Sequence, residues 1–318
     1  MTARHHSLPN LADFDLRLLR VFHAVVHNKG FAAAQDELGV SQSTISIQIG
    51  QLEDRLGMRL CERGRKGFHL TEEGQIVFEA SLSLFRAVEN FRGMVGSTRG
   101  QLIGEVHFGI VDAIASNQEI NLHQGIGDFA QLAPEVKLHI NLSSPQELLQ
   151  GLMEEHYHVI LSPMSRLHSS VRFIPTFREQ QTLYCGAGHP LFELPERELS
   201  TDSISQHAYA GRSYMRDWQP PQEIEFRHQA TASHMESIAL MILSGGYLGY
   251  LPSHYAARWV EAGQMRALLE YTLSYHEQFY LAYRKSERNR AAQAFARCIR
   301  QQMETETETD AGLRDLQT

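Results

Sequence analysis

The stretch that decides the fold of this chain is LGVSQSTISIQIGQLEDRLG, residues 38–57. The glycine in its second place can end a helix in the left-handed conformation, and the serine in its fourth place is a good helix N-cap. Ile45, Ile49 and Leu52 then recur at spacings of four and three, which predicts a helix with one buried face. A helix, a short glycine turn and a capped helix form the pattern of a helix-turn-helix.

The exposed face of this predicted helix carries small and polar side chains. Such side chains reach base edges in the major groove, and amides at a helix N-terminus bind phosphate. A polar face is also typical of an ordinary surface helix. Ile47 has two open interpretations, contact with a thymine methyl group or a tolerated exposed aliphatic side chain. We predict that the DNA contacts of this helix come from Gln42, Ser43, Thr44, Ser46, Ile47, Gln48 and Gln51.

The surroundings of the helix favour DNA binding. Apolar spacing predicts helices over residues 14–28 and 31–38 before it. A basic cluster with two glycines, residues 63–67, follows and is typical of a hairpin wing. Its cations, Arg63, Arg65 and Lys66, would lie against the phosphate backbone or in the minor groove. A solvated charged loop is the alternative for this cluster.

Composition limits the class of protein. The 318 residues are 42% hydrophobic and 21% charged, which fits two or three globular domains. The net charge of −8 argues against nucleic acid, but residues 1–70 hold nine Lys and Arg against seven Asp and Glu. No apolar run is long enough for a membrane helix, and no signal peptide is evident, so we expect a cytoplasmic protein with no membrane partner. The three cysteines build neither a disulfide framework nor a zinc site.

Residues 72–98 form the next expected element, a long helix. Val77, Leu84 and Phe91 recur at a spacing of seven, and a helix with such a stripe usually buries it against another helix. Pairing with a second copy of the chain is the favoured interpretation, since dimers are typical of DNA-binding proteins of this layout. Packing on its own domain is the alternative.

The order of strands and helices expected in the body, residues 103–303, predicts an α/β domain with a parallel sheet. Its first half alternates strands and helices, and the helix after residue 144 begins with a serine–glutamate capping box. The second half repeats the pattern less regularly. The segment 304–318 is acidic and has few apolar residues, which predicts that it is disordered. The expected strands cover residues 105–111, 136–142, 158–161, 182–185, 249–252 and 278–284, and the expected helices cover 120–131, 145–155, 234–243 and 289–303.

The order of these motifs resembles the LysR-type transcriptional regulators. In the first seventy residues the resemblance rests on Leu18 to Phe22, Gly30-Phe31, Ala34, Leu38, Val40-Ser41-Gln42-Ser43, Ile45-Ser46, Gln48-Ile49, Gln51-Leu52-Glu53, Leu56-Gly57, Leu60, Glu62-Arg63 and Leu70-Thr71-Glu72-Glu73-Gly74. In the body it rests on Gly109, Leu148-Leu149, His189-Pro190-Leu191, Gly245-Gly246-Tyr247-Leu248-Gly249 and Leu251-Pro252.

The sequence departs from the family pattern at a few positions. Ile47 stands where the family usually has Arg, and Gly50 where a basic residue is common. Cys61 replaces a usual Phe and is expected to be a buried, inert thiol. His158 replaces a customary Asp and forms a His-x-His pair with His156; a surface or core role is favoured over metal binding, because acidic and thiol partners are missing.

The resemblance implies an α+β multidomain fold. It consists of a winged helix-turn-helix over 14–71, a linker helix for dimerisation over 72–98, and a two-lobed α/β effector domain over 103–303, similar to periplasmic binding proteins. Lobe I is expected over about 103–174 and 279–303, and lobe II over about 175–278.

Effector candidates follow from the rule that ligands sit at the carboxyl ends of parallel strands, near helix N-termini. For Ser144, helix capping is already a sufficient explanation, and for Arg212 a surface role is as plausible as effector binding. The candidate residues are Asp112, Ala113, Ser143, Ser144, Arg212, Ser213 and Thr231. Since Arg binds carboxylates well, we expect a small anionic or polar effector.

The predicted function is therefore a transcriptional regulator whose promoter binding responds to an effector between the two lobes. The expected partners are double-stranded DNA, the effector, a homodimer or homotetramer through the linker helix and effector domains, and RNA polymerase; no cofactor, metal or catalytic residue is expected. The alternative is a two-lobed binding protein or an enzyme with a vestigial DNA-binding head. The sequence contains no recognisable catalytic motif that would support an enzyme. The segment 125–130 imitates a dinucleotide-binding fingerprint, but it lies inside a predicted helix.

Overall fold

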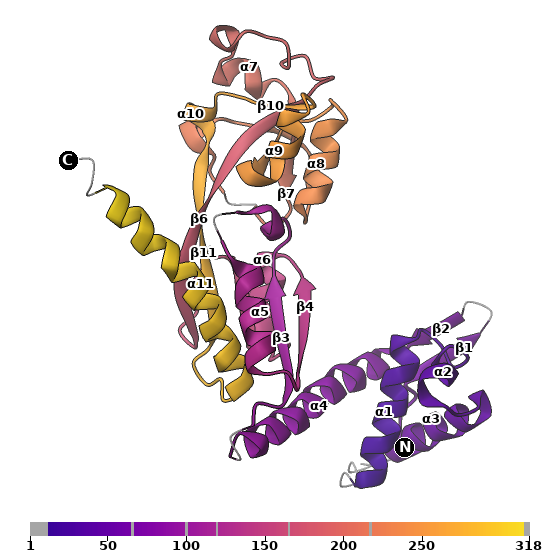
Figure 1. Cartoon of the computed structure of the whole chain (residues 1–318). Coiled ribbons are helices and arrows are strands. Elements are labelled where there is room, and N and C mark those ends of the chain that lie inside the picture. Colours follow the sequence, from indigo (N-terminus) through magenta and orange to yellow (C-terminus); the bar gives the residue numbers. More distant parts are fainter. Residues whose placement is uncertain are drawn as a thin grey trace. The chain divides into compact units, whose positions relative to one another are not determined.

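The computed structural model describes residues 12–64, 67–98, 101–118, 120–164, 166–215 and 218–314. The side chains of residues 63, 64, 67, 97, 98, 223 and 304–314 are outside this description. The chain divides between Glu89 and Asn90 into two compact units, each of which is described by itself (Figure 1).

The first unit is a three-helix domain with a small hairpin. Its helices are α1 (Asp13–His27), α2 (Ala34–Leu38) and α3 (Gln42–Leu56), and its strands are β1 (Cys61–Gly64) and β2 (Gly67–Leu70). The glycine turn and cap are as the sequence predicts, since Gly39 has a φ of +64° and the Ser41 hydroxyl accepts a hydrogen bond from the Thr44 amide at 3.3 Å. The second helix begins at Ala34, later than the expected Phe31.

The core of the first unit is formed by the predicted apolar stripes. Leu18 and Phe22 of α1 and Ile45, Ile49 and Leu52 of α3 are fully or almost fully buried. The Asp15 carboxylate of α1 accepts hydrogen bonds from the guanidinium of Arg55 on α3, with Nη2 at 2.6 Å from Oδ2. Cys61 is buried at the edge of this core, as expected.

A long helix, α4 (Glu72–Thr98), follows the hairpin. The Thr71 hydroxyl caps it by accepting from the Gly74 amide at 2.9 Å. Val77 and Leu84, two members of the sevenfold stripe, pack against the core of the first unit together with Phe78 and Phe85. The alternative of packing on its own domain is therefore correct for this part of the stripe.

The second unit is built on a seven-stranded sheet with the order β10-β6-β11-β5-β3-β4, in which β9 also pairs with β6. β4, β3 and β5 are parallel, as predicted, whereas β11 runs antiparallel to both β5 and β6. The strands of the sheet are β3 (Gly104–Ile110), β4 (Val136–Leu142), β5 (Val159–Pro163), β6 (Val171–Gly186), β9 (Gly249–Pro252), β10 (Met265–Ala267) and β11 (Tyr275–Arg284).

Two long strands, β6 and β11, run from one lobe of this unit into the other (Figure 1). Lobe I has a core around Phe108, Phe129 and Phe295. Its helices are η1 (Ile114–Ser116), α5 (Leu122–Leu132), α6 (Pro145–Met153) and α11 (Arg290–Arg314).

Lobe II surrounds the other ends of β6 and β11. Its core includes Tyr209 and Tyr250, and a second cluster includes Ile238 and Ile242. The remaining elements are η2 (Glu196–Glu198), α7 (Thr201–Ser205), β7 (Ala208–Arg212), η3 (Pro221–Glu223), β8 (Arg227–Ala232), α8 (Met235–Leu243), α9 (Ser253–Glu261) and α10 (Glu270–Leu273). β7 and β8 pair in parallel as a separate two-stranded sheet.

The C-terminal segment differs from the expectation of disorder. α11 is helical through Arg314, so the acidic run that begins at Glu304 continues the last helix of lobe I. Residues 315–318 lie outside the described residues. Among the described residues, no helix has the length and apolar character needed to cross a membrane.

Candidate functional site

The exposed face of α3 is the first candidate surface. Ile47 is 62% exposed although it is aliphatic, and Gln42, Ser43, Thr44 and Gln51 are also exposed. Ser43, Ile47 and Gln51 lie opposite the buried stripe of the helix, and Gln42 lies at its N-terminal end.

Two of the seven predicted contact residues on α3 are less accessible. Ser46 and Gln48 are half-buried, and the Gln48 Oε1 atom has no hydrogen-bond partner among the described residues. Ile47 therefore stands out as the large side chain at the centre of the exposed face.

The N-terminus of α3 is held by polar side chains. The Ser41 hydroxyl lies 2.8 Å from that of Ser43 and 2.9 Å from that of Thr44, and Gln35 of α2 accepts from the Gln42 amide at 2.9 Å. These contacts fix the first turn of α3 relative to α2, which gives the exposed face a defined geometry.

The hairpin after α3 is the expected wing. Glu53 of α3 accepts hydrogen bonds from the amides of Leu60 at 2.8 Å and Cys61 at 3.2 Å, so the first strand of the hairpin is tied to the helix. β1 and β2 pair antiparallel up to Gly64 and Gly67. The predicted phosphate contacts Arg65 and Lys66 lie between these glycines, outside the described residues, as does the Arg63 side chain.

The second candidate site is a cleft between the two lobes of the second unit. It has a volume of about 870 Å³, and its lobe I wall comes from residues that follow β4 and that end β5. Lobe I, lobe II and strand β11 all contribute walls. The lining residues are Pro145, Gln146, Leu149, Pro163, Met164, Arg166, Ser213, Tyr214, Met215, Trp218, Tyr275, His276, Glu277 and Gln278.

The structure separates the predicted effector residues. Ser213 lines the cleft, whereas Asp112 and Ala113 line a second, more open hollow of about 610 Å³ with residues of α8 and α9. Thr231 lies on β8 opposite Gly211 and lines neither space.

The two serines before α6 have structural roles. Ser144 forms the predicted capping box, in which it accepts from the Glu147 amide and Glu147 accepts from the Ser144 amide at 2.9 Å. The Ser143 hydroxyl lies 3.4 Å from that of Tyr157. Neither serine lines the cleft.

Arg212 lies behind the cleft wall, with only 4% of its side chain exposed. Its Nη1 donates to Glu277 at 2.8 Å and its Nη2 donates to Gln181. Burial opposes its charge, but Tyr275 and Glu277 raise the pKa of Arg212, so the residue remains a cation. Its Nε atom is buried with no hydrogen-bond partner among the described residues.

A buried polar network extends from Arg212 along β6. Gln181 donates to Glu179 at 2.6 Å, and Glu179 lies 2.9 Å from His254 Nε2 on α9. Burial raises the pKa of the nearby Tyr214 hydroxyl to about 12, so that side chain is a neutral hydrogen-bonding group. No local pattern in the sequence predicts this network, because Glu179 and Gln181 belong to a continuous polar run, residues 178–182, without the alternation of a strand.

Among the described residues, three hydrogen bonds made by side chains join the two lobes. The Asp112 carboxylate accepts from the Met235 amide at the start of α8, at 2.6 Å. Gln146 donates to the Tyr214 carbonyl at 2.7 Å, and the Ser116 hydroxyl lies 2.9 Å from His254 Nδ1. The lobes are thus in contact both beside the cleft and beside the second hollow.

Comparison with known proteins covers both units. Residues 16–75 match the family described as "Bacterial regulatory helix-turn-helix protein, lysR family", and residues 99–304 match the "LysR substrate binding domain".

Individual relatives agree with the family matches. The chain is 38% identical over 291 residues to the HTH-type transcriptional activator BauR of Pseudomonas aeruginosa, an alignment that covers 90% of this chain and 94% of BauR. It is 25% identical over 288 residues to the RuBisCO operon transcriptional regulator of Allochromatium vinosum, covering 88% and 93%.

The fold also matches a full-length solved structure. CbnR complexed with its target DNA aligns with a TM-score of 0.63 at 19% identity, covering 90% of this chain and 99% of that one. The winged helix-turn-helix, the two-lobed body and the family matches agree. The chain therefore belongs to the LysR family of transcriptional regulators, with a DNA-binding head and an effector-binding domain.

Proposed function

We propose that the first unit reads its operator through α3 and its wing, and that the second unit binds a small polar or anionic effector in the cleft between its lobes. The observation that carries the first part is the exposure of Ile47 at the centre of the polar face of α3. An aliphatic side chain there is suited to a thymine methyl group, and the polar residues beside it are suited to base edges.

The wing adds contacts to the phosphate backbone of the DNA. Arg63, Arg65 and Lys66 supply cations to the phosphates, and because these contacts do not depend on base identity they set affinity more than specificity. Ser46 and Gln48 act at the margin of the helix surface.

The effector class follows from the walls of the cleft. Gln146, Ser213 and Tyr214 offer polar groups, while Leu149 and Trp218 offer apolar contact. The Arg212 cation is already paired with Glu277. Glu277 lines the cleft and Arg212 lies behind it, so an anionic effector would have to displace Glu277 to reach Arg212, and the loss of this ion pair would connect ligand binding to the shared strand β11.

Asp112 and Ala113 act in closure of the lobes rather than at the centre of the cleft, and Ser143, Ser144 and Thr231 support the surrounding elements. Effector binding stabilises one arrangement of the lobes, and this changes how subunits pack and how the DNA-binding heads are spaced. The role is regulation rather than catalysis.

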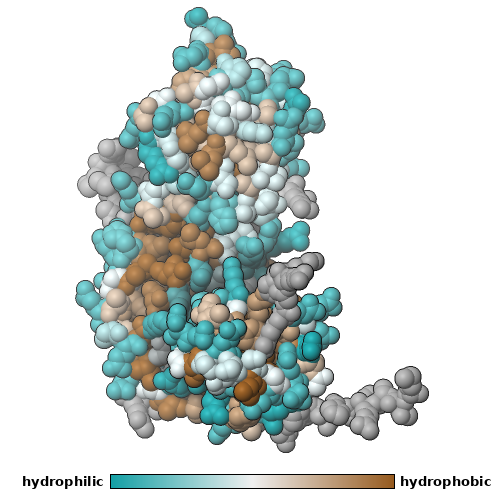
Figure 2. All heavy atoms as spheres, turned by 90° about the vertical axis from the view of Figure 1, so that its right-hand side faces the viewer, coloured by the Kyte–Doolittle hydropathy of each residue, from teal (hydrophilic) through white to brown (hydrophobic). Residues whose placement is uncertain are grey.

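Self-association is part of the proposal. Leu132, Ile140 and Leu142 are exposed by 43–57% at or near the β4 edge of lobe I, and Leu240 on α8 is 62% exposed. Figure 2 shows hydrophobic residues gathered on this side of the molecule. On α4, Ile76 and Phe91 are exposed by 66% and 61%. These apolar surfaces suit contacts in a homodimer or homotetramer, and RNA polymerase is a further proposed partner.

Fluorescence anisotropy of the full chain tests the DNA-binding part. The probe is the DNA upstream of its own gene and of the divergent neighbour, with a scrambled duplex for comparison, and the variants are Arg65→Ala and Ile47→Ala. Arg65→Ala is expected to weaken binding to both duplexes by a similar factor, whereas Ile47→Ala is expected to reduce the preference for the operator. Tyr271→Ala, a fully exposed position in lobe II, is the control. Equal binding of both duplexes by the wild type at every salt concentration would contradict the proposal.

A further inference from the structure

Two histidines and a glutamate gather on the two parallel strands at the edge of lobe I. Glu105 and His107 are two residues apart on β3, so their side chains share one face of the sheet. The parallel register places His107 directly beside His139 of β4. Val106 and Phe108, which alternate with them, point into the core of lobe I.

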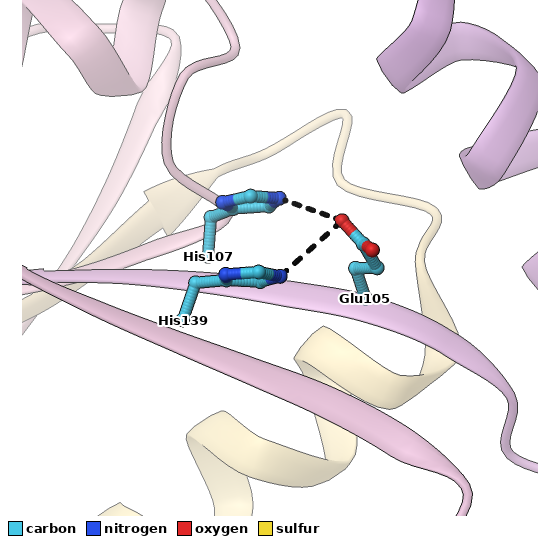
Figure 3. A group of neighbouring side chains, drawn as sticks. All are labelled: Glu105, His107 and His139. Carbon is cyan, nitrogen blue, oxygen red and sulfur yellow. Dashed lines mark ion pairs between the residues drawn. The ribbon is translucent and has the colours of Figure 1, made fainter. Parts of the chain in front are cut away.

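The three side chains converge on one point (Figure 3). Glu105 Oε2 lies 3.4 Å from His107 Nε2 and 3.4 Å from His139 Nε2, and all three ligand atoms lie within 4.8 Å of one another. Charge-assisted N–H···O hydrogen bonds are shorter, about 2.7–2.9 Å. Ligand atoms around a tetrahedral Zn²⁺ with bonds of about 2.0–2.1 Å lie roughly 3.3–3.4 Å apart. The separation from the carboxylate is thus within ion-pair distance and also matches the spacing of ligands around a shared ion.

The surroundings suit an ion that enters from solvent. The side chains of His107, His139 and Glu105 are 25%, 29% and 35% exposed. The His139 Nε2 atom itself is buried and makes no hydrogen bond among the described residues. The two imidazole rings are stacked, with centroids 4.5 Å apart and planes 4° from parallel. Because the rings are parallel, their in-plane lone pairs are also nearly parallel, so both rings must turn before their nitrogens can bind one ion.

A third histidine nearby is excluded as a ligand. His158 is buried, and its Nδ1 accepts a hydrogen bond from the His107 amide at 3.0 Å. Its Nε2 therefore carries the proton and faces Asn90 Oδ1 at 3.3 Å. His156, its partner in the His-x-His pair of the sequence, is instead 3.8 Å from Glu154. The candidate ligands therefore lie on two neighbouring strands, β3 and β4, and not in the His-x-His pair of the sequence.

We propose that Glu105, His107 and His139 form a binding site for a divalent transition-metal ion, with Zn²⁺ as the best fit. Two imidazole nitrogens and one carboxylate oxygen are a ligand set that Zn²⁺ accepts, and water would complete the coordination. The bound ion would link β3 to β4, and because it binds only the folded unit it would stabilise the domain. The site lies away from the residues that line the effector cleft, so this inference does not depend on the identity of the effector.

Isothermal titration with Zn²⁺ on the full chain, freed of metal by a chelator, tests the site. All proteins carry His5→Gln and His6→Gln, because adjacent histidines near a terminus can bind transition metals by themselves. The protein with Glu105, His107 and His139 intact is expected to bind one Zn²⁺ per chain. His139→Gln and Glu105→Gln are expected to weaken binding at least tenfold, whereas His123→Gln, an exposed histidine of α5 in the same lobe, is expected to bind like the parent.

Two further measurements separate binding from folding. Circular dichroism and melting temperatures in the absence of metal are expected to be the same for Glu105→Gln and its parent, and Zn²⁺ is expected to raise the melting temperature of the parent but not of the variant. Affinity is expected to fall at acidic pH, because protonated imidazole cannot bind a metal. Absence of Zn²⁺ binding by the parent, or equal binding by His139→Gln, would overturn the proposal.

Discussion

The Asp112 carboxylate of lobe I accepts a hydrogen bond from the Met235 backbone amide of lobe II at 2.6 Å. Met235 begins α8, whose N-cap residue His234 makes no side-chain cap hydrogen bond. The first turn of α8 is thus capped by a residue 123 positions away in the sequence, and the negative charge is favourable at the positive end of the helix dipole. One interaction serves both as a helix cap and as a link between lobes.

Replacing Asp112 with Ala is expected to loosen the first turn of α8. Loss of a helix cap costs about 1 kcal/mol, which corresponds to roughly fivefold faster amide exchange at Met235 and its neighbours. Hydrogen–deuterium exchange of the full chain measures this, with Ser143→Ala as a matched polar-to-alanine control in lobe I. Unchanged exchange at the start of α8 in Asp112→Ala would show that the carboxylate does not hold the lobes together.

Gly74 and Gly50 predict opposite effects of the same substitution. A Cβ atom at Gly74 would lie 2.0 Å from the Leu60 carbonyl oxygen, so Gly74→Ala must move α4 or the wing and is expected to destabilise the first unit by about 1–3 kcal/mol. A Cβ atom at Gly50 would meet nothing within 4 Å, and Gly50→Ala is expected to stabilise α3 by up to about 1 kcal/mol. Chemical denaturation followed by circular dichroism compares the two variants with the wild type. The prediction fails if Gly74→Ala is as stable as Gly50→Ala.

The salt dependence of DNA binding is expected to be shallow, with a log–log slope smaller in magnitude than about 8, because α3 carries Ile47 and Gly50 in place of cations. Ile47→Arg is expected to steepen the slope by about 0.9 if the new cation neutralises one phosphate. Tyr271→Arg adds the same charge at a fully exposed position of lobe II and is expected to leave the slope unchanged. Anisotropy titrations at several salt concentrations give all three slopes; a wild-type slope of about −8 or steeper would refute the expectation.

The Asp15–Arg55 pair predicts a pH effect on the first unit. The hydrogen bond from Arg55 lowers the pKa of Asp15, so the stability that this carboxylate contributes is present above its unfolded pKa of about 3.9 and is lost as the pH falls through its lower folded pKa. Asp15→Asn is therefore expected to lower the melting temperature of the first unit by several degrees at pH 7 and to differ progressively less below pH 4. Calorimetry across this range tests it, and a difference that stays constant down to pH 2 would contradict it.

Local patterns explain why the first unit could be predicted from the sequence. The Ser41 cap, the Gly39 turn and the apolar stripe of α3 act within one or two helical turns, and the structure has all three. In the second unit, β4 and the capping box of α6 were predicted for the same reason.

Contacts between distant segments explain what could not be predicted. The expected strand at residues 182–185 is the end of the 16-residue β6, whose polar residues Glu179 and Gln181 are buried in a network rather than alternating toward water. Arg212 meets Glu277 across 65 residues, so no local pattern reveals that its charge is already paired. The metal-ligand candidates likewise lie on two strands whose register only the fold defines.

The pairing of β6 with β11 shifts its register between Gln278 and Tyr280, next to the residue that holds Arg212. Thr176 and Gln278 brace this irregularity by hydrogen bonds to the carbonyl of Phe279 at 3.0 and 2.9 Å. Because both lobes share these two strands, they can twist about a common axis but cannot slide apart. We expect the pair to twist most easily at the bulge, where the ladder of hydrogen bonds is interrupted. A molecule that displaced Glu277 from Arg212 would change the contacts beside this bulge, where a small change of twist would move one whole lobe relative to the other.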